Sequence, residues 1–95
     1  METEDAGARI DLQMGEWKPA LEIMRSKTDR RLGGTHGAHW SEIEQLRREF
    51  QGLRIKKVAT WHAPIEQREE AQSHFAEMWS DWVARARAAQ RMLSE

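Results

Sequence analysis

Residues 64–93 read PIEQREEAQSHFAEMWSDWVARARAAQRML. Apolar residues return in it at alternating steps of three and four, which is the spacing of one face of an α-helix. The register consists of Ile65, Arg68, Gln72, Phe75, Trp79, Trp82, Ala86, Ala89 and Leu93. Pro64 suits a first helical turn, where a missing N–H is harmless. We therefore predict a long helix that starts near Pro64.

The length of this helix predicts a partner. About thirty residues span roughly 45 Å at 1.5 Å per residue. A compact globule of this chain length is only about 30 Å across. The helix must therefore protrude, bend or pack along another chain, and we expect that chain to be a second copy or a different protein.

The segment before residue 33 predicts a strand and then a helix. Ile10, Leu12 and Met14 alternate with polar residues, which favours a short strand over residues 9–14. A helix is predicted from about Lys18 to Leu32, followed by a glycine-rich loop over residues 33–40. Residues 1–8 are acidic and small, and we expect them to form a disordered tail.

The middle of the chain predicts another helix. Ser41 and Glu44 have the spacing of a capping box, and Gly52 is a natural residue for a helix end. Residues 53–61 alternate at first, which favours a strand that could pair with residues 9–14; a continued helix is the other interpretation. The predicted fold is mainly α, with three helices, the third long, and room for a short two-stranded β ribbon. It forms one small domain over residues 9–95.

Composition excludes several classes of protein. The 95 residues contain no cysteine, so the chain has no disulfide framework and no thiolate chemistry. No apolar run approaches the roughly 20 residues that span a bilayer. The first residues are acidic, unlike the basic and then apolar start of a signal peptide. We expect a cytoplasmic protein that does not enter membranes.

The near-neutral net charge of −1 hides an uneven distribution. Residues 1–17 carry five acids and one base, whereas residues 18–57 carry ten bases and five acids. Residues 58–95 carry six acids and four bases. A basic middle segment can attract an acidic protein or a nucleic acid, or it can simply attract the chain's own acidic start.

An aromatic cluster on the long helix predicts protein binding. Phe75, Trp79 and Trp82 share one face, and Met78 lies beside them. Tryptophan is enriched at the centres of protein interfaces, and methionine adapts to irregular surfaces. The predicted function is that of a small regulatory or inhibitory protein that binds a protein partner through this face and its basic middle. The other interpretation of these aromatic residues is that they form the core.

DNA binding is the alternative function. Five bases lie within residues 47–57, namely Arg47, Arg48, Arg54, Lys56 and Lys57, and they could neutralise phosphates. The order of strand, helix, loop and serine-capped helix resembles that of the ribbon–helix–helix repressors. That resemblance implies a dimer whose ribbon presents Arg9, Asp11 and Gln13 to the major groove. The long glycine-rich loop and the long last helix depart from that pattern.

No motif in the chain predicts catalysis. It has no phosphate-binding glycine loop, no nucleophile elbow and no zinc-protease signature. His36 and His39 lie three residues apart in the loop, but no further metal ligand stands at a recognisable spacing. We therefore expect no enzyme activity, no small-molecule substrate, no metal and no cofactor.

Overall fold

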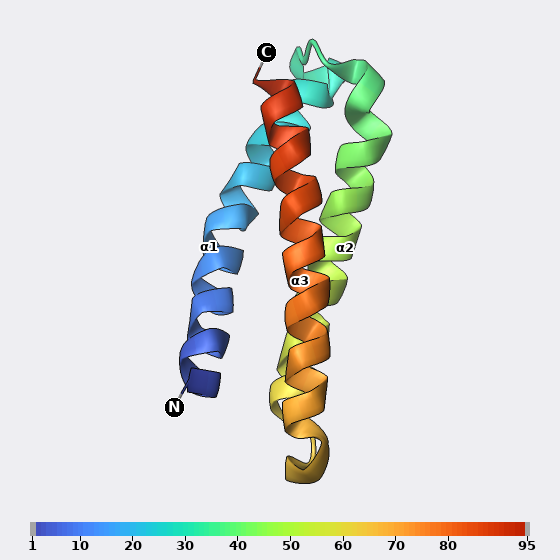
Figure 1. The fold of residues 1–95 in the computed structure, drawn as a ribbon. Helices are drawn as coiled ribbons and strands as arrows, with labels where there is room; N and C mark the ends of the chain where they lie inside the picture. The colour runs from blue at the N-terminus through green and yellow to red at the C-terminus, as the bar shows by residue number, and fades with distance from the viewer. Residues whose placement is uncertain (1, 95) are drawn as a thin grey trace.

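The protein is a bundle of three long helices in a computed structural model (Figure 1). The structure describes the backbone of residues 2–94 and the side chains of residues 7–94. Helix α1 spans Glu2–Thr28, α2 spans Trp40–Trp61 and α3 spans Ile65–Leu93. Two short 3₁₀ turns, η1 (Arg30–Leu32) and η2 (Gly37–His39), connect α1 to α2. The prediction of three helices is confirmed, and residues 2–94 contain no strand.

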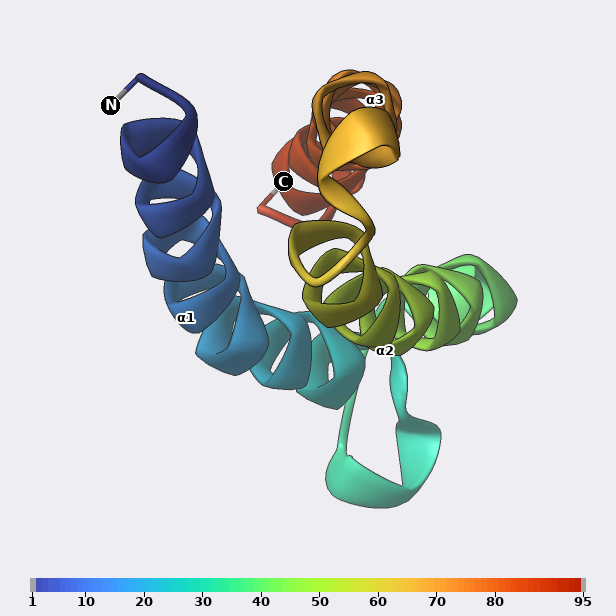
Figure 2. The same ribbon diagram turned by 90° about the horizontal axis from the view of Figure 1, so that it is seen from below.

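The helices run up, down and up, so that the chain ends near the α1–α2 connection (Figure 1). Seen along its axis, the bundle is a triangle with one helix at each corner (Figure 2). Its extents are 49 × 18 × 17 Å. The argument that α3 needs a partner because of its length was therefore wrong. Helices of 27 and 22 residues accompany its 29 residues, and the whole protein is elongated.

The core runs the length of the bundle between the three helices. Helix α1 contributes Ile10, Met14, Trp17, Leu21 and Met24 to it. Helix α2 contributes Ile43, Leu46 and Phe50. Helix α3 contributes Phe75, Trp79, Trp82, Val83, Ala86, Ala89 and Leu93. The register predicted for α3 is confirmed from Gln72 to Leu93, since all seven of its positions in that range are buried.

The strand predicted at residues 9–14 was wrong, because these residues belong to α1. Ile10 and Met14 are both buried, whereas Leu12 between them is 71% exposed. A spacing of four fits one face of a helix as well as one face of a strand, so only the middle residue distinguishes the two. Helix α1 also starts well before Lys18 and continues through Pro19. The tail predicted at residues 1–8 begins outside the described residues, and from Glu2 onward its backbone is part of α1; its disorder in solution stays a prediction.

The strand predicted at residues 53–61 was also wrong, because α2 continues to Trp61 without ending at Gly52. Thr60 is buried and Leu53 is half-buried, which continues the helical spacing of the core residues before them. Ile55, which suggested the strand, points into solvent. The predicted capping box does not form either: α2 begins at Trp40, and Glu44 pairs with Arg47 instead of reaching back.

The start of the α1–α2 connection is held by Asp29. Its carboxylate accepts hydrogen bonds from the backbone N–H of Arg31 and from the Arg31 guanidinium. The side-chain hydrogen bonds from Arg31 lower the pKa of Asp29 and raise the pKa of Arg31. Gly33 then ends the turn with a φ of 81°, which glycine adopts without strain.

Candidate interaction surface

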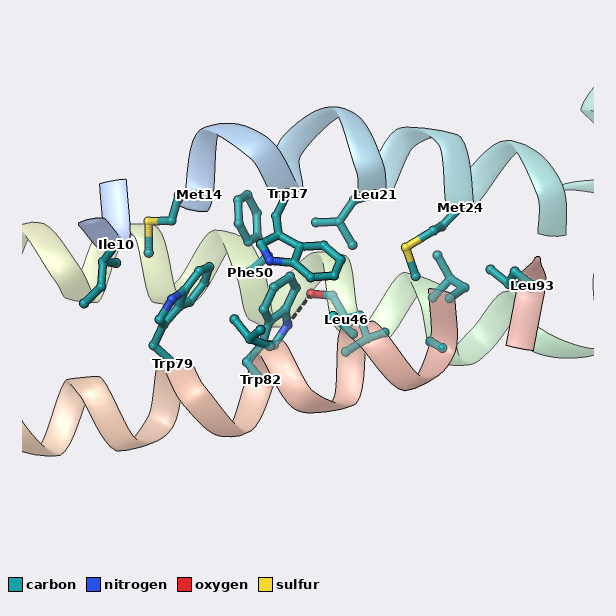
Figure 3. Close-up of a cluster of buried hydrophobic side chains, with 14 of the residues drawn as sticks. Ile10, Met14, Trp17, Leu21, Met24, Leu46, Phe50, Trp79, Trp82 and Leu93 are labelled. Carbon is teal, nitrogen blue, oxygen red and sulfur yellow. Dashed lines mark hydrogen bonds between the residues drawn. The ribbon is translucent and has the colours of Figure 1, made fainter. Parts of the chain in front are cut away.

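The two tryptophans predicted to bind a partner, Trp79 and Trp82, lie inside the bundle (Figure 3). Phe75, Trp79 and Trp82 are all buried within this single chain. The rings of Trp79 and Trp82 stack with centroids 5.2 Å apart, and Phe50 packs against both. In this structure these rings stabilise the fold and present no face to solvent. Met78 is half-buried and lines a surface hollow between α2 and α3.

The indole N–H groups of the two core tryptophans on α3 both have hydrogen-bond acceptors. Trp82 Nε1 donates to the Leu46 carbonyl at 3.1 Å, and Trp79 Nε1 donates to Gln13 Oε1 at 2.7 Å. Gln13 therefore serves the core, although the ribbon interpretation assigned it to a DNA groove. That interpretation fails for Arg9, Asp11 and Gln13 together, because the strand on which it rests is a helix.

The predicted basic cluster divides into paired and unpaired residues. Arg47 contacts Glu22 and Glu44, both at 3.0 Å. Lys57 contacts Asp11 at 2.9 Å and lies 4.7 Å from the centre of the Trp61 ring. The pairs of Arg47 with Glu22 and of Lys57 with Asp11 join α1 to α2, so two of the five predicted bases contribute to the bundle. Arg48, Arg54 and Lys56 are exposed, and within the described chain none of them has a carboxylate within 4 Å.

A groove between α1 and α2 brings the basic residues together with apolar ones. Two adjoining hollows form it, and the larger has a volume of about 380 Å³. We call it the basic groove: it is lined by Asp11, Met14, Gly15, Lys18, Leu21, Glu22, Arg47, Phe50, Gln51, Arg54, Lys57 and Val58. The buried residues Met14, Leu21 and Phe50 form its floor.

The basic groove has an ion pair at each end and two unpaired cations between them. At one end Glu22 pairs with Arg47 across the groove, and at the other end Asp11 pairs with Lys57. Lys18 from α1 and Arg54 from α2 lie between these ends and line both hollows. No carboxylate of the described side chains lies within 4 Å of either. Two cations on facing walls of one groove favour an anion between them.

Sequence reasoning missed Lys18 and Gly15 as parts of this surface. Lys18 marked only the predicted start of a helix, and Gly15 had no role. Neither has a signal of its own in the sequence. Lys18 is one of the ten bases counted in residues 18–57. That Lys18 faces Arg54 across the groove follows only from the packing of α1 on α2.

A second hollow lies between α2 and α3. It has a volume of about 320 Å³ and is lined by residues that include Gly52, Leu53, Lys56 and Met78. Its charges are largely compensated, because Arg85 contacts both Glu49 (3.0 Å) and Asp81 (3.3 Å). The hydrogen bond with Glu49 is the main cause that raises the pKa of Arg85. This hollow offers apolar area beside one cation without an ion pair among the described side chains, Lys56.

The histidines predicted as weak metal candidates stay near each other. The rings of His36 and His39 have centroids 6.4 Å apart, and His39 lies 3.7 Å from Glu42. Within the described residues, no group of three or more histidine, aspartate or glutamate side chains is placed to hold a metal ion. The described helices also include none that is both long and apolar enough to cross a bilayer.

Comparisons of the chain with protein-family models, with curated proteins and with solved structures found no match. Its function must therefore be argued from the surface itself. Of the two grooves described above, the basic groove is the one in which two cations from different helices, Lys18 and Arg54, lack an ion pair beside an apolar floor.

Proposed function

We propose that this protein is a small regulatory binding protein that holds an acidic segment of a protein partner in the basic groove. The observation that carries the proposal is the pair of cations, Lys18 and Arg54, between two cross-groove ion pairs. Binding sites for proteins commonly combine an apolar centre with charged residues around it. Burial of the apolar area stabilises the complex, and the charges select the partner.

The proposal moves the binding surface away from the aromatic face of α3. Trp79 and Trp82 are already buried, and exposing them would break the core that holds the helices together. The basic middle segment keeps its predicted role, but through Arg54 and Lys18 more than through Arg47 and Lys57, whose charges are compensated within the chain.

The proposal is tested by capture from a lysate of cells that express the protein, with and without nuclease. The variant Lys18→Glu/Arg54→Glu reverses the two free charges of the groove. A matched control, Arg87→Glu/Arg91→Glu, reverses two exposed bases on α3. We expect a protein that the parent and the control retain, that nuclease treatment does not release, and that the groove variant loses.

Two outcomes would overturn the proposal. Equal capture by all three proteins would show that the groove is not the binding surface. Capture that depends on nucleic acid would favour the DNA-binding alternative. Binding to duplex DNA would then weaken steeply with salt, and each lost phosphate contact would flatten the slope by about one unit.

A further inference from the structure

Two glycines within helices have no explanation in the packing of this chain. Four of the six glycines meet atoms of the chain itself or adopt a positive φ, namely Gly7, Gly33, Gly34 and Gly37. Gly15 in α1 and Gly52 in α2 have nothing within 4 Å of where a Cβ would lie. A glycine inside a helix destabilises it relative to alanine. Open space at such a position leaves room for something that the chain does not itself supply.

Gly15 lies in the wall of the basic groove. Pro19 follows it by four residues, so Pro19 has no N–H to donate to the Gly15 carbonyl, and its ring crowds that carbonyl. The Pro19 ring would crowd the carbonyl of any residue at position 15, so this contact does not explain why that residue is glycine. The absent side chain instead keeps the groove open beside Met14 and Val58, where the backbone of an occupant can approach closely.

From these features we infer that the occupant of the basic groove is an acidic amphipathic α-helix, seated over Gly15. The inference rests on the function proposed above. From Asp11 to Glu22 the groove follows α1 for roughly 17 Å at 1.5 Å per residue, or about three helical turns. The occupant places apolar side chains against Met14 and Val58 and carboxylates between Lys18 and Arg54.

A helical occupant fits better than an extended one because of backbone hydrogen bonding. Residues 2–94 form no strand, so the groove offers no free sheet edge to an extended segment. An extended peptide would leave many of its own N–H and C=O groups unpaired against the apolar floor. A helix satisfies these groups internally and packs its side chains between two helices.

The charge order of the groove favours a protein helix over a nucleic acid. A nucleic acid carries phosphates at regular short intervals along its whole length. Asp11 and Glu22, at the two ends, would face those phosphates, and the bases beside them are already paired. An amphipathic helix can carry its acids only in the middle, opposite Lys18 and Arg54.

The test uses the whole protein, labelled with ¹⁵N, and a synthetic peptide as the probe. The peptide has about 14 residues, with leucine every three or four positions and glutamate on the flanks of that face. Its control is the same peptide with lysine in place of glutamate. We expect saturable amide shifts around Gly15, Lys18 and Arg54, with the acidic peptide binding at least about tenfold more tightly than the basic one.

Two pairs of variants test whether the peptide binds in the basic groove. Gly15→Leu fills the wall, whereas Gly52→Leu adds the same side chain to the other hollow. Val58→Glu adds an acid to the groove, whereas Ile55→Glu adds one to an exposed site outside it. We expect the first member of each pair to weaken peptide binding at least about tenfold and the second to leave it unchanged. Circular dichroism confirms that each variant is folded.

The outcomes separate this inference from the proposed function. If capture of a cellular partner depends on Lys18 and Arg54 but the acidic peptide does not bind, or Gly15→Leu binds like the parent, the helical occupant is wrong and the proposed function stands. If duplex DNA shifts the same amides and the peptide does not, both are overturned.

Discussion

Replacing Trp82 with alanine tests whether the aromatic seam is the core of this protein. Trp82 is 0% exposed, and its ring lies 5.2–5.3 Å from the rings of Trp17, Phe50 and Trp79. Trp→Ala changes in protein cores cost about 3–5 kcal/mol. Each aromatic pair contributes about 0.5–1.5 kcal/mol to stability in addition to the contribution of its buried area. With three ring partners, we expect a loss near the upper limit, about 5 kcal/mol.

That loss is large for so small a chain. Stabilities of roughly 0.05–0.15 kcal/mol per residue correspond to about 5–14 kcal/mol for a chain of this length. Trp82→Ala is therefore expected to lose a third or more of the folding free energy, or to unfold. Urea unfolding followed by circular dichroism measures the change, because the helical signal reports directly on the bundle.

Two further variants keep the test decisive if Trp82→Ala does not fold. Trp82→Phe retains an aromatic ring but loses the hydrogen bond to the Leu46 carbonyl, so we expect a folded protein less stable by about 2 kcal/mol. Ile55→Ala, at a side chain that is 74% exposed, is expected to change stability by less than about 0.5 kcal/mol. A folded Trp82→Ala protein that loses less than about 1 kcal/mol would refute the assignment of this ring to the core.

Three other predictions concern single features. The hydrogen bonds from Arg31 lower the pKa of Asp29, so its charged form stabilises the fold; this contribution is present at neutral pH and lost as the pH falls below about 4. When the pH is lowered from neutral to well below about 4, the Tm should therefore fall less for Asp29→Asn than for the parent, and an equal fall contradicts a stabilising role of the Asp29 charge. Gly52→Ala should stabilise α2 by about 0.5–1 kcal/mol in urea unfolding, because the added methyl meets open space, and a destabilised variant would show that the space is filled. The length of α3 no longer supports the homodimer predicted from it, and light scattering at micromolar concentration decides the question: twice the mass of the chain would show self-association, and a monomer at every concentration excludes the homodimer.

The last helix could be predicted from sequence because its pattern has only one interpretation. Steps of three and four continue from Phe75 to Leu93, and no strand places such residues on one face. Helix α1 was harder because apolar residues lie on both of its faces. Leu12 and Ile23 are exposed on the side opposite to Met14 and Leu21, so the helical period is obscured.

The candidate site could be predicted only in part. The sequence alone shows the excess of bases over residues 18–57, but which of them are paired depends on which acids of α1 face α2. Asp11 compensates Lys57 from 46 positions away in the sequence, and Arg47 meets Glu22 across the same interface. No local pattern predicts such pairs, because they follow from the rotation of α1 about its own axis in the packed bundle.

The aromatic residues show why composition is a poor guide to a surface in a protein of this shape. A bundle 49 Å long and about 18 Å wide has a thin core, so most core positions are flanked by solvent within one helical turn. Large rings fill such a core with few residues, which is the use made here of Trp17, Trp79 and Trp82. The same length leaves long grooves between neighbouring helices. The proposed binding surface lies on the flanks of the core positions, where Lys18 is next to Trp17 and Arg54 is next to Leu53 in the sequence. The charges that carry the proposal are those that the bundle leaves unpaired there, because they remain able to bind a partner.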